Sequence, residues 1–222
     1  MNAPYAHLIR QWDLIPLAAL DKKVTVIGAG AVGSLLVIEL AKMGFSSIEV
    51  WDFDTVSVEN LSSQWYPRGF IGRPKTEALR EVVEYFTGDL IAIRTERYES
   101  GLLDPGIIVT AVDSMATRRA IWEAHKRRSF DVVIVDPRMS AETGLIFVMH
   151  PGRERDIAEY EHTLYSDEAA MHEKCTAKAT MYCAGLLASQ TAKIIRDLAV
   201  GDRPVVRTLQ WSVKEDHMKA WK

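Results

Sequence analysis

The chain has 222 residues, of which 48% are hydrophobic, so it can bury one sizeable core. Its formal net charge is −3, with lysine and arginine dispersed along the sequence, which excludes the electrostatic footprint of a protein that binds nucleic acid duplexes. The sequence has neither a run of about 18 apolar residues nor an opening basic stretch followed by an apolar core, so we expect a cytoplasmic protein that neither spans a membrane nor is secreted.

The cysteine and histidine content excludes two further classes. The two cysteines, Cys175 and Cys183, do not make a disulfide framework in a chain of this size, and neither belongs to a Cys-x-x-Cys pair. The six histidines are scattered. A four-ligand structural zinc site therefore has no obvious ligands.

Predicted strands and helices alternate along most of the chain. In chain order, we expect a short helix over 6–20, a strand over 24–27, a helix over 31–43, a strand over 47–51, a helix over 74–87, strands over 91–98 and 107–112, a helix over 114–128, strands over 132–135 and 145–149, a helix over 177–198, and a strand over 205–211 followed by a charged tail. This alternation predicts a Rossmann-like, doubly wound, mostly parallel α/β sheet, here with a C-terminal antiparallel strand extension.

Residues 151–174 interrupt the alternation. They contain seven acidic and three basic residues and few apolar positions in register, which predicts a long, mobile crossover loop. We expect the whole chain, 1–222, to form a single domain, with an N-terminal helical arm over 1–20 that carries Arg10 and Gln11.

The run Val-Thr-Val-Ile-Gly28-Ala-Gly30-Ala-Val-Gly33 predicts a nucleotide site. A short apolar strand, a glycine turn and a helix start together hold a phosphate by backbone N–H groups. Gly28 permits the tight turn, Gly30 lets the backbone approach a phosphate, and Gly33 lets the helix pack against the strand.

An acidic pair follows the second predicted strand. Asp52 lies 24 positions after Gly28, where a carboxylate in this fold accepts hydrogen bonds from ribose hydroxyls. Asp54 follows two residues later and is a second candidate, although it could serve only to start a turn.

The segment that follows points to a particular protein family. The pattern Asp52-x-Asp54-x-Val-x-x-x-Asn60-Leu-x-x-Gln64, followed by Gly-Arg-Pro-Lys75 at a helix start, resembles the signature of the ThiF/MoeB-type adenylating family, which also contains the ubiquitin-activating enzymes. Two further segments are similar to that family: Arg10-Gln11, and Thr110-Ala-Val-Asp113-Ser-Met-Ala-Thr-Arg118. The likeness covers roughly residues 8 to 200.

The resemblance implies an ATP-dependent enzyme that adenylates the C-terminal carboxylate of a small ubiquitin-like or sulfur-carrier protein ending in Gly or Gly-Gly. Lys75 then supplies a point charge for the phosphates, Arg10 reaches into the partner subunit's site of a homodimer, and Asp113 binds Mg²⁺. Asn60 and Gln64 donate hydrogen bonds to phosphate oxygens. Taken singly, Lys75 could be a solvated lysine, Arg10 a surface charge, and Asp113 a helix cap.

Three departures from the family pattern bear on the substrate. Ser63 stands where the family has an arginine before the glutamine, and Arg68 or Arg73 could take over its role. Ser114 replaces an asparagine. The zinc-binding cysteine pairs of many members are absent, so the C-terminal part has to be held by packing.

Cys175 is the candidate nucleophile. It lies next to Lys174, at the end of the acidic segment and just before a predicted helix, and both neighbours favour the thiolate. It is similar to the family's cysteine that accepts the activated acyl group as a thioester or takes part in sulfur transfer. The alternative is a small buried residue, which is the reading we prefer for Cys183.

Other features have weaker functional readings. We expect His125 and the basic residues after it to form a solvated helix end. Trp65 and Tyr66 could stack on an adenine or pack in a core. Asp136 and Arg138 follow a strand and could line the crevice that a peptide tail enters.

Two other functions compete with adenylation. A nicotinamide-dependent oxidoreductase would use the glycine turn and Asp52, but it has no use for the segment from Asn60 to Lys75. A nucleotide-binding scaffold without catalysis, able to capture a ubiquitin-like partner, is the other, and the serine at position 63 favours it.

Overall fold

A single sheet runs through the part of the chain that the structure describes. The structure is a computed structural model, and it describes residues 6–127, 131–165, 179–201 and 207–221. Its eight-stranded sheet has the order β3-β2-β1-β4-β5-β6-β7-β8. The strands are β1 (Val24–Ile27), β2 (Ile48–Trp51), β3 (Ala92–Arg94), β4 (Gly106–Thr110), β5 (Val132–Ser140), β6 (Thr143–Met149), β7 (Thr208–Ser212) and β8 (His217–Trp221).

The sheet changes direction halfway across. Strands β3, β2, β1, β4 and β5 are parallel, with Val26 of β1 level with Val50 on one side and Val109 on the other. From β5 to β8 each neighbouring pair is antiparallel. The predicted mostly parallel sheet with an antiparallel C-terminal extension is confirmed. The charged tail was not expected to form β8, which lies at the open edge beside β7.

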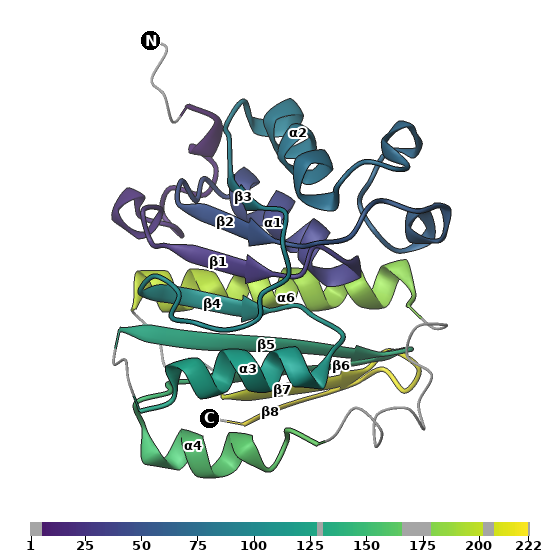
Figure 1. The fold of residues 1–222 in the computed structure, drawn as a ribbon. Coiled ribbons are helices and arrows are strands. Elements are labelled where there is room, and N and C mark those ends of the chain that lie inside the picture. The colour runs from purple at the N-terminus through teal and green to yellow at the C-terminus, as the bar shows by residue number, and fades with distance from the viewer. Residues whose placement is uncertain (1–5, 128–130, 166–178, 202–206, 222) are drawn as a thin grey trace.

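Helices cover both faces of the sheet (Figure 1). They are α1 (Ala31–Lys42), α2 (Lys75–Thr87), α3 (Met115–His125), α4 (Glu154–Glu161) and α6 (Met181–Val200). In β4, Ile107 and Val109 join the apolar cluster that includes α1, α2 and α6, whereas Ile108 joins the cluster that includes α3 and α4. Successive strand residues point to opposite faces, so a fully apolar strand serves two cores. This is the doubly wound arrangement that the sequence predicts.

Two predicted segments differ from the structure. The expected helix over 6–20 is a pair of short 3₁₀ helices, Ala6–Leu8 and Leu17–Ala19, because Pro16 has no N–H and restricts the residue before it. The expected loop over 151–174 contains helix α4, whose first turn holds Glu154 and Asp156. Residues 166–178 lie outside the described part of the chain.

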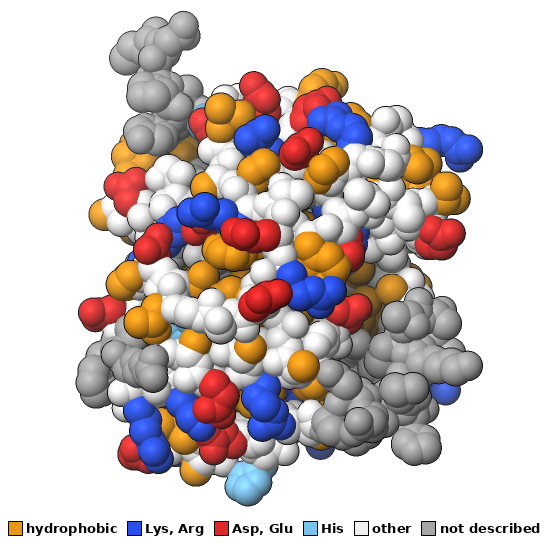
Figure 2. All heavy atoms as spheres, in the orientation of Figure 1, with side chains coloured by type: hydrophobic (Ala, Val, Ile, Leu, Met, Phe, Trp, Pro, Cys, Tyr) orange, Lys and Arg blue, Asp and Glu red, His pale blue; other side chains and the backbone are white. Residues whose placement is uncertain are grey.

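The face shown in Figure 2 carries basic and acidic side chains interspersed, with apolar groups scattered between them. The basic field that duplex binding requires is not seen on this face.

Among the described residues, none of the helices combines the length and the apolar character needed to cross a bilayer. Two further 3₁₀ helices, Val58–Ser62 and Arg68–Phe70, lie between β2 and α2.

Candidate active site

The candidate site lies at the carboxyl ends of the parallel strands. Strand β1 leads into the turn at Gly28, β2 into Asp52, and β4 into the loop that holds Asp113. These three strands are parallel neighbours, so their carboxyl ends meet at the edge toward which their arrowheads point in Figure 1. Open α/β sheets bind ligands at this edge, where the strand order reverses.

The glycine turn has room for side chains at one of its three glycines. Gly28 has φ +99°, and a Cβ there would lie 2.3 Å from the carbonyl oxygen of Ala111. A Cβ on Gly33 would lie 1.9 Å from the carbonyl oxygen of Gly28. In contrast, nothing lies within 4 Å of a Cβ built on Gly30, which is the N-cap of α1. The open start of α1 therefore suits a phosphate, because the first N–H groups of a helix have no partner within it.

Asp52 braces the glycine turn. Its Oδ2 accepts a hydrogen bond from the Ala29 N–H at 2.7 Å, and its Oδ1 accepts one from the Asp54 N–H at 2.8 Å. Burial raises the pKa of Asp52, although the positive charge of Lys75 acts in the opposite direction. A carboxylate has about four lone-pair positions, so two backbone donors leave capacity for ribose hydroxyls.

Lys75 and Asp54 form an ion pair at the start of α2. The Lys75 Nζ lies 3.0 Å from the Asp54 Oδ2, and the Lys75 N–H donates to the Asp54 carbonyl oxygen. Lys75 is 6% exposed, so the reading as a solvated lysine is wrong. Asp54 does more than start a turn, because it holds this buried ammonium group beside Asp52.

Asn60 and Gln64 have different surroundings. The Asn60 Oδ1 accepts a hydrogen bond from the Ser57 N–H at 3.0 Å and so closes the start of the 3₁₀ helix Val58–Ser62. The Oε1 of Gln64 is buried and has no hydrogen-bond partner among the described residues. A buried amide oxygen without a partner is costly, and a ligand donor would relieve that cost.

The two candidate replacements for the arginine missing at Ser63 differ in their surroundings. Ser63 is buried. Arg68 is exposed in the 3₁₀ helix Arg68–Phe70. Arg73 forms an ion pair with Glu81 at 2.8 Å and stacks on the ring of Phe70. Arg73 is thus engaged by α2, and its substitution for the missing arginine stays a prediction.

Asp113 is exposed in the loop between β4 and α3. It does not cap α3, because the Ser114 hydroxyl is the cap and accepts a hydrogen bond from the Thr117 N–H at 3.2 Å. No group of three or more His, Cys, Asp or Glu residues suited to a metal occurs in the described ranges. Mg²⁺ usually takes one or two carboxylates plus substrate phosphates, so a single exposed Asp113 fits that kind of site.

The segment that carries Arg10 lies near the end of α1, away from the carboxyl ends of the parallel strands. The neighbouring Gln11 donates to the carbonyl oxygen of Met43, just after α1, and Arg196 near the end of α6 donates to the carbonyl oxygen of Leu14. Helix α1 has 12 residues and is therefore about 18 Å long. Arg10 is exposed, and its neighbour Gln11 is bonded at the end of α1, whereas the glycine turn lies at the start of that helix.

The two cysteines have different outcomes. Cys175 lies outside the described residues, so its role as a nucleophile stays a prediction. Cys183 is fully buried in α6, and burial raises the pKa of its thiol. Cys183 is a core residue, as the sequence indicates.

Comparison with known proteins agrees with this arrangement. The family model described as "ThiF family" matches residues 8–221. The chain belongs to the ThiF family. Among curated proteins, it is 36% identical over 105 residues to a NEDD8-activating enzyme E1 catalytic subunit of Arabidopsis thaliana, which covers 45% of this chain and 23% of that protein. It is 26% identical over 168 residues to a SUMO-activating enzyme subunit 2 of Dictyostelium discoideum, a match that covers 69% of this chain and 24% of that protein.

Solved structures share the fold of this ThiF-family chain. The crystal structure of PaaA has a TM-score of 0.78 and 15% identity, and the match covers 98% of this chain and 82% of PaaA. The crystal structure of E. coli MccB with ATP has a TM-score of 0.74 and 13% identity, and the match covers 100% of this chain and 71% of the MccB chain. The chain spans about a quarter of the length of the two curated relatives above, 23% and 24%.

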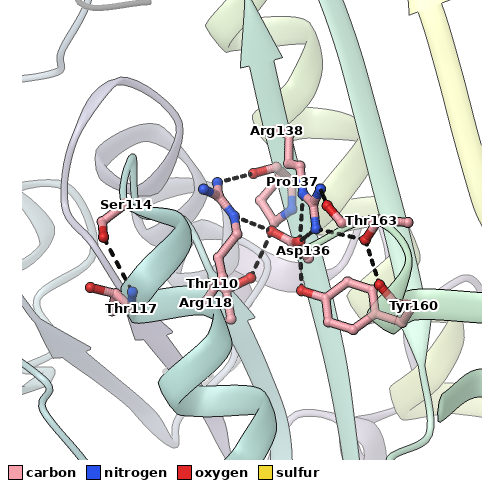
Figure 3. A network of polar contacts seen from close by, with 9 residues as sticks. All are labelled: Thr110, Ser114, Thr117, Arg118, Asp136, Pro137, Arg138, Tyr160 and Thr163. Atoms are coloured by element: carbon pink, nitrogen blue, oxygen red, sulfur yellow. Dashed lines mark hydrogen bonds and ion pairs between the residues drawn. The ribbon is translucent and has the colours of Figure 1, made fainter. Parts of the chain in front are cut away.

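A buried network beside the site was not predicted. The carboxylate of Asp136, in β5, is fully buried and accepts hydrogen bonds at 2.7 to 2.8 Å from Thr110, Arg118, Arg138 and Tyr160 (Figure 3). Thr110 ends β4, so the network begins next to the loop of Asp113. We call these five residues the Asp136 network.

Two guanidinium groups keep the Asp136 carboxylate ionised. Burial opposes ionisation, but the charges of Arg118 and Arg138 outweigh it and lower the pKa of Asp136 to about 2. The pKa of the Tyr160 hydroxyl is raised by burial and by the Asp136 charge, so Tyr160 stays a donor. Arg138 also donates to the carbonyl oxygen of Thr163 at 2.8 Å, which ties the end of α4 to the sheet.

The structure corrects two sequence interpretations. Asp136 does not line an open crevice, because its side chain is enclosed by its four partners. His125 is not part of a solvated helix end: it is buried, its Nδ1 lies 2.8 Å from the carbonyl oxygen of Ile121, and its Nε2 accepts a hydrogen bond from the Leu103 N–H. A sequence signal for the network is an acidic residue directly after the apolar run 132–135, where a buried strand continues.

We expect Asp136→Asn to lower the free energy of unfolding at pH 7 by about 3 to 5 kcal/mol, because it leaves two buried guanidinium groups without their counter-charge. The native pKa of Asp136 lies below its ordinary value of 3.8. Its contribution to stability is therefore present above that value and is lost as pH falls toward about 2. Urea unfolding at pH 7, 5 and 3 measures both effects.

The matched control is Asp104→Asn, since the Asp104 side chain is 73% exposed. The control should stay close to the parent protein at all three pH values. The expectation fails if Asp136→Asn is as stable as the control, or if it loses as much stability between pH 5 and 3 as the parent protein does.

Proposed function

We propose that this chain uses ATP to adenylate the C-terminal carboxylate of a small ubiquitin-like or sulfur-carrier protein that ends in Gly or Gly-Gly. The observation that carries the proposal is the meeting of an open helix start at Gly30, the buried Lys75 ammonium group and the Asp52 carboxylate at one edge of the sheet. Support also comes from the ThiF-family match and from E1-type relatives.

In the proposed reaction, a carboxylate oxygen of the partner attacks the α-phosphorus of ATP. A new C–O–P linkage forms, the bond from the α-phosphorus to the bridging oxygen breaks, and pyrophosphate leaves with that electron pair. Both reactants are anions, so positive charge has to be fixed where negative charge accumulates. Lys75 supplies such a charge, and the N–H groups at the start of α1 bind a phosphate.

Magnesium would be held by Asp113 and the phosphates, and it would supply further positive charge at the leaving group. Asp52 accepts hydrogen bonds from the ribose hydroxyls, while Asp54 keeps the Lys75 ammonium group beside the nucleotide. The Gln64 amide N–H₂ donates to a phosphate oxygen, and its buried Oε1 accepts a hydrogen bond from a donor on the ligand. The solved structures of E. coli MccB include one with AMPCPP and MccA, which supports nucleotide binding by this fold.

The acyl group then passes to a thiol of the same chain. The Cys175 thiolate attacks the carbonyl carbon of the acyl adenylate, a thioester forms, and AMP leaves with the oxygen. The family match over 8–221 favours this chemistry over the nicotinamide-dependent oxidoreductase. The scaffold alternative predicts a different result in one measurement: a scaffold binds ATP but does not turn it over.

We expect ATP–pyrophosphate exchange when a small protein ending in Gly-Gly is supplied, and none when its last two residues are removed. Candidate partners are the small proteins encoded in neighbouring reading frames. Lys75→Met should lower the exchange rate at least about 100-fold, because the phosphates lose a fixed positive charge. Lys193→Met removes a half-exposed lysine of α6 and is the control. Tight ATP binding without exchange for every candidate partner contradicts the proposal and supports the scaffold.

Arg10 should act across a two-fold interface, because its neighbour Gln11 lies at the end of α1, about 18 Å along the helix from the glycine turn. Arg10→Ala and Lys75→Met proteins should each be nearly inactive. Co-expressed in equal amounts, they should recover about a quarter of the parent exchange activity, since half of the dimers are mixed and one of two sites in each is intact. Sizing of the protein in solution accompanies the assay. No recovery in the mixed preparation, or full activity of Arg10→Ala alone, excludes action in trans.

Cys175→Ala should leave the pyrophosphate exchange rate unchanged and abolish the thioester, because the thiol acts after adenylation. A band that joins chain and partner, and that disappears on addition of thiol, reports the thioester on a non-reducing gel. Cys183→Ala is the control and should keep the band, since Cys183 is a buried core residue. Survival of the band in Cys175→Ala removes Cys175 as the nucleophile.

A further inference from the structure

Tyr66 contacts the glycine turn from the segment that follows Gln64. Its hydroxyl donates a hydrogen bond to the carbonyl oxygen of Ala29 at 2.6 Å. Both residues are buried, with 6% of Tyr66 and 0% of Ala29 exposed. The Ala29 N–H is held by Asp52, so both polar backbone groups of this residue are fixed by side chains from other parts of the chain.

This contact determines the direction of one phosphate-facing N–H group. In a trans peptide, the carbonyl of one residue and the N–H of the next point in opposite directions. Holding the Ala29 carbonyl toward Tyr66 therefore aims the Gly30 N–H away from Tyr66. Gly30 is the N-cap of α1, so its N–H belongs to the group of donors at the helix start.

The turn needs such a contact because it contains glycine at position 30. Rotation of the Ala29–Gly30 peptide plane would carry Gly30 to positive φ, which glycine adopts at little cost. The free space around Gly30 offers no steric obstacle to this rotation, since nothing lies within 4 Å of its Cβ direction. A hydrogen bond to the Ala29 carbonyl opposes the rotation without filling the space that a phosphate would occupy.

A second hydrogen bond fastens the same segment to α1. The Trp65 N–H donates to the Ser34 Oγ at 3.1 Å, and Ser34 is fully buried in the first turns of α1. The neighbour of Tyr66 is thus hydrogen-bonded to the helix that begins at the glycine turn. Trp65, the other aromatic residue here, is 41% exposed.

We propose that Tyr66 is a positioning residue for nucleotide binding: its hydroxyl holds the Ala29–Gly30 peptide so that the Gly30 N–H stays directed at the phosphate. The inference rests on the proposed function, because it names a residue that prepares the same nucleotide site. It assigns Tyr66 no contact with ATP. The Tyr66 hydroxyl therefore contributes to binding of the phosphates and not to binding of the nucleoside.

The test is Tyr66→Phe, which keeps the ring and removes the hydroxyl. Calorimetric titration of the full chain measures binding of ATP and, separately, of adenosine, which has no phosphate. We expect ATP binding to weaken about threefold to tenfold, the usual effect of losing one hydrogen bond, and adenosine binding to stay within about twofold. The ratio between the two affinities separates positioning of the phosphate donors from a general loosening of the fold.

Tyr98→Phe is the matched control. The Tyr98 hydroxyl also donates to a backbone carbonyl, that of Gly101, and the side chain is 5% exposed, but it lies in the loop after β3. The control should bind ATP as the parent does, with a melting temperature lowered by a similar amount to that of Tyr66→Phe.

The outcomes are distinct for the two proposals. If the parent protein binds no ATP, the proposed function fails before the variant is measured. If the parent binds ATP and Tyr66→Phe binds it equally well, or loses ATP and adenosine affinity in the same proportion, the positioning role is overturned while the proposed function stands.

Discussion

The candidate site depends on three backbone segments that approach one another too closely for a side chain. The carbonyl of Ala111 occupies the Cβ direction of Gly28, and the carbonyl of Gly28 occupies that of Gly33. The end of β1, the first turn of α1 and the loop after β4 are therefore fixed against each other. Since that loop continues to Asp113, the contact also sets how far the proposed metal ligand lies from the start of α1.

Around this contact, carboxylates outnumber the positively charged groups. Asp52 and Asp54 place two carboxylates beside the single ammonium group of Lys75, and Arg73 is paired with Glu81 on α2. A triphosphate adds further negative charge, so the site described here needs cations from elsewhere. Under the proposed function these come from Mg²⁺ and from Arg10 of a second copy, which would explain why Arg10 lies at the far edge of its own chain.

Local sequence patterns were sufficient for the fold and for most of the candidate site. Apolar strands, the glycine turn and the polar residue after each strand are read within a few neighbouring positions. The structure places Asp52 against the glycine turn and Lys75 beside Asp54, while their roles toward a ligand stay predictions. The Asp136 network was not predictable in this way. Its partners lie 18 to 26 positions from Asp136, except for Arg138, and only tertiary packing decides that these charges are buried. Helix α4 was missed because its apolar face is narrow.

The Asp136 network has a consequence for how the chain reaches its native state. Its members come from β4, α3, β5 and α4, so a folding intermediate that lacks any one of these elements exposes ionised groups in place of a finished cluster. Partial assemblies are disfavoured, because a buried charge with half of its partners is worse than one left in water. Packing of α3 and α4 is thereby coupled to completion of the sheet. Folding of this region is cooperative because the Asp136 charge is stable in the interior only when all four of its hydrogen-bond partners are in place.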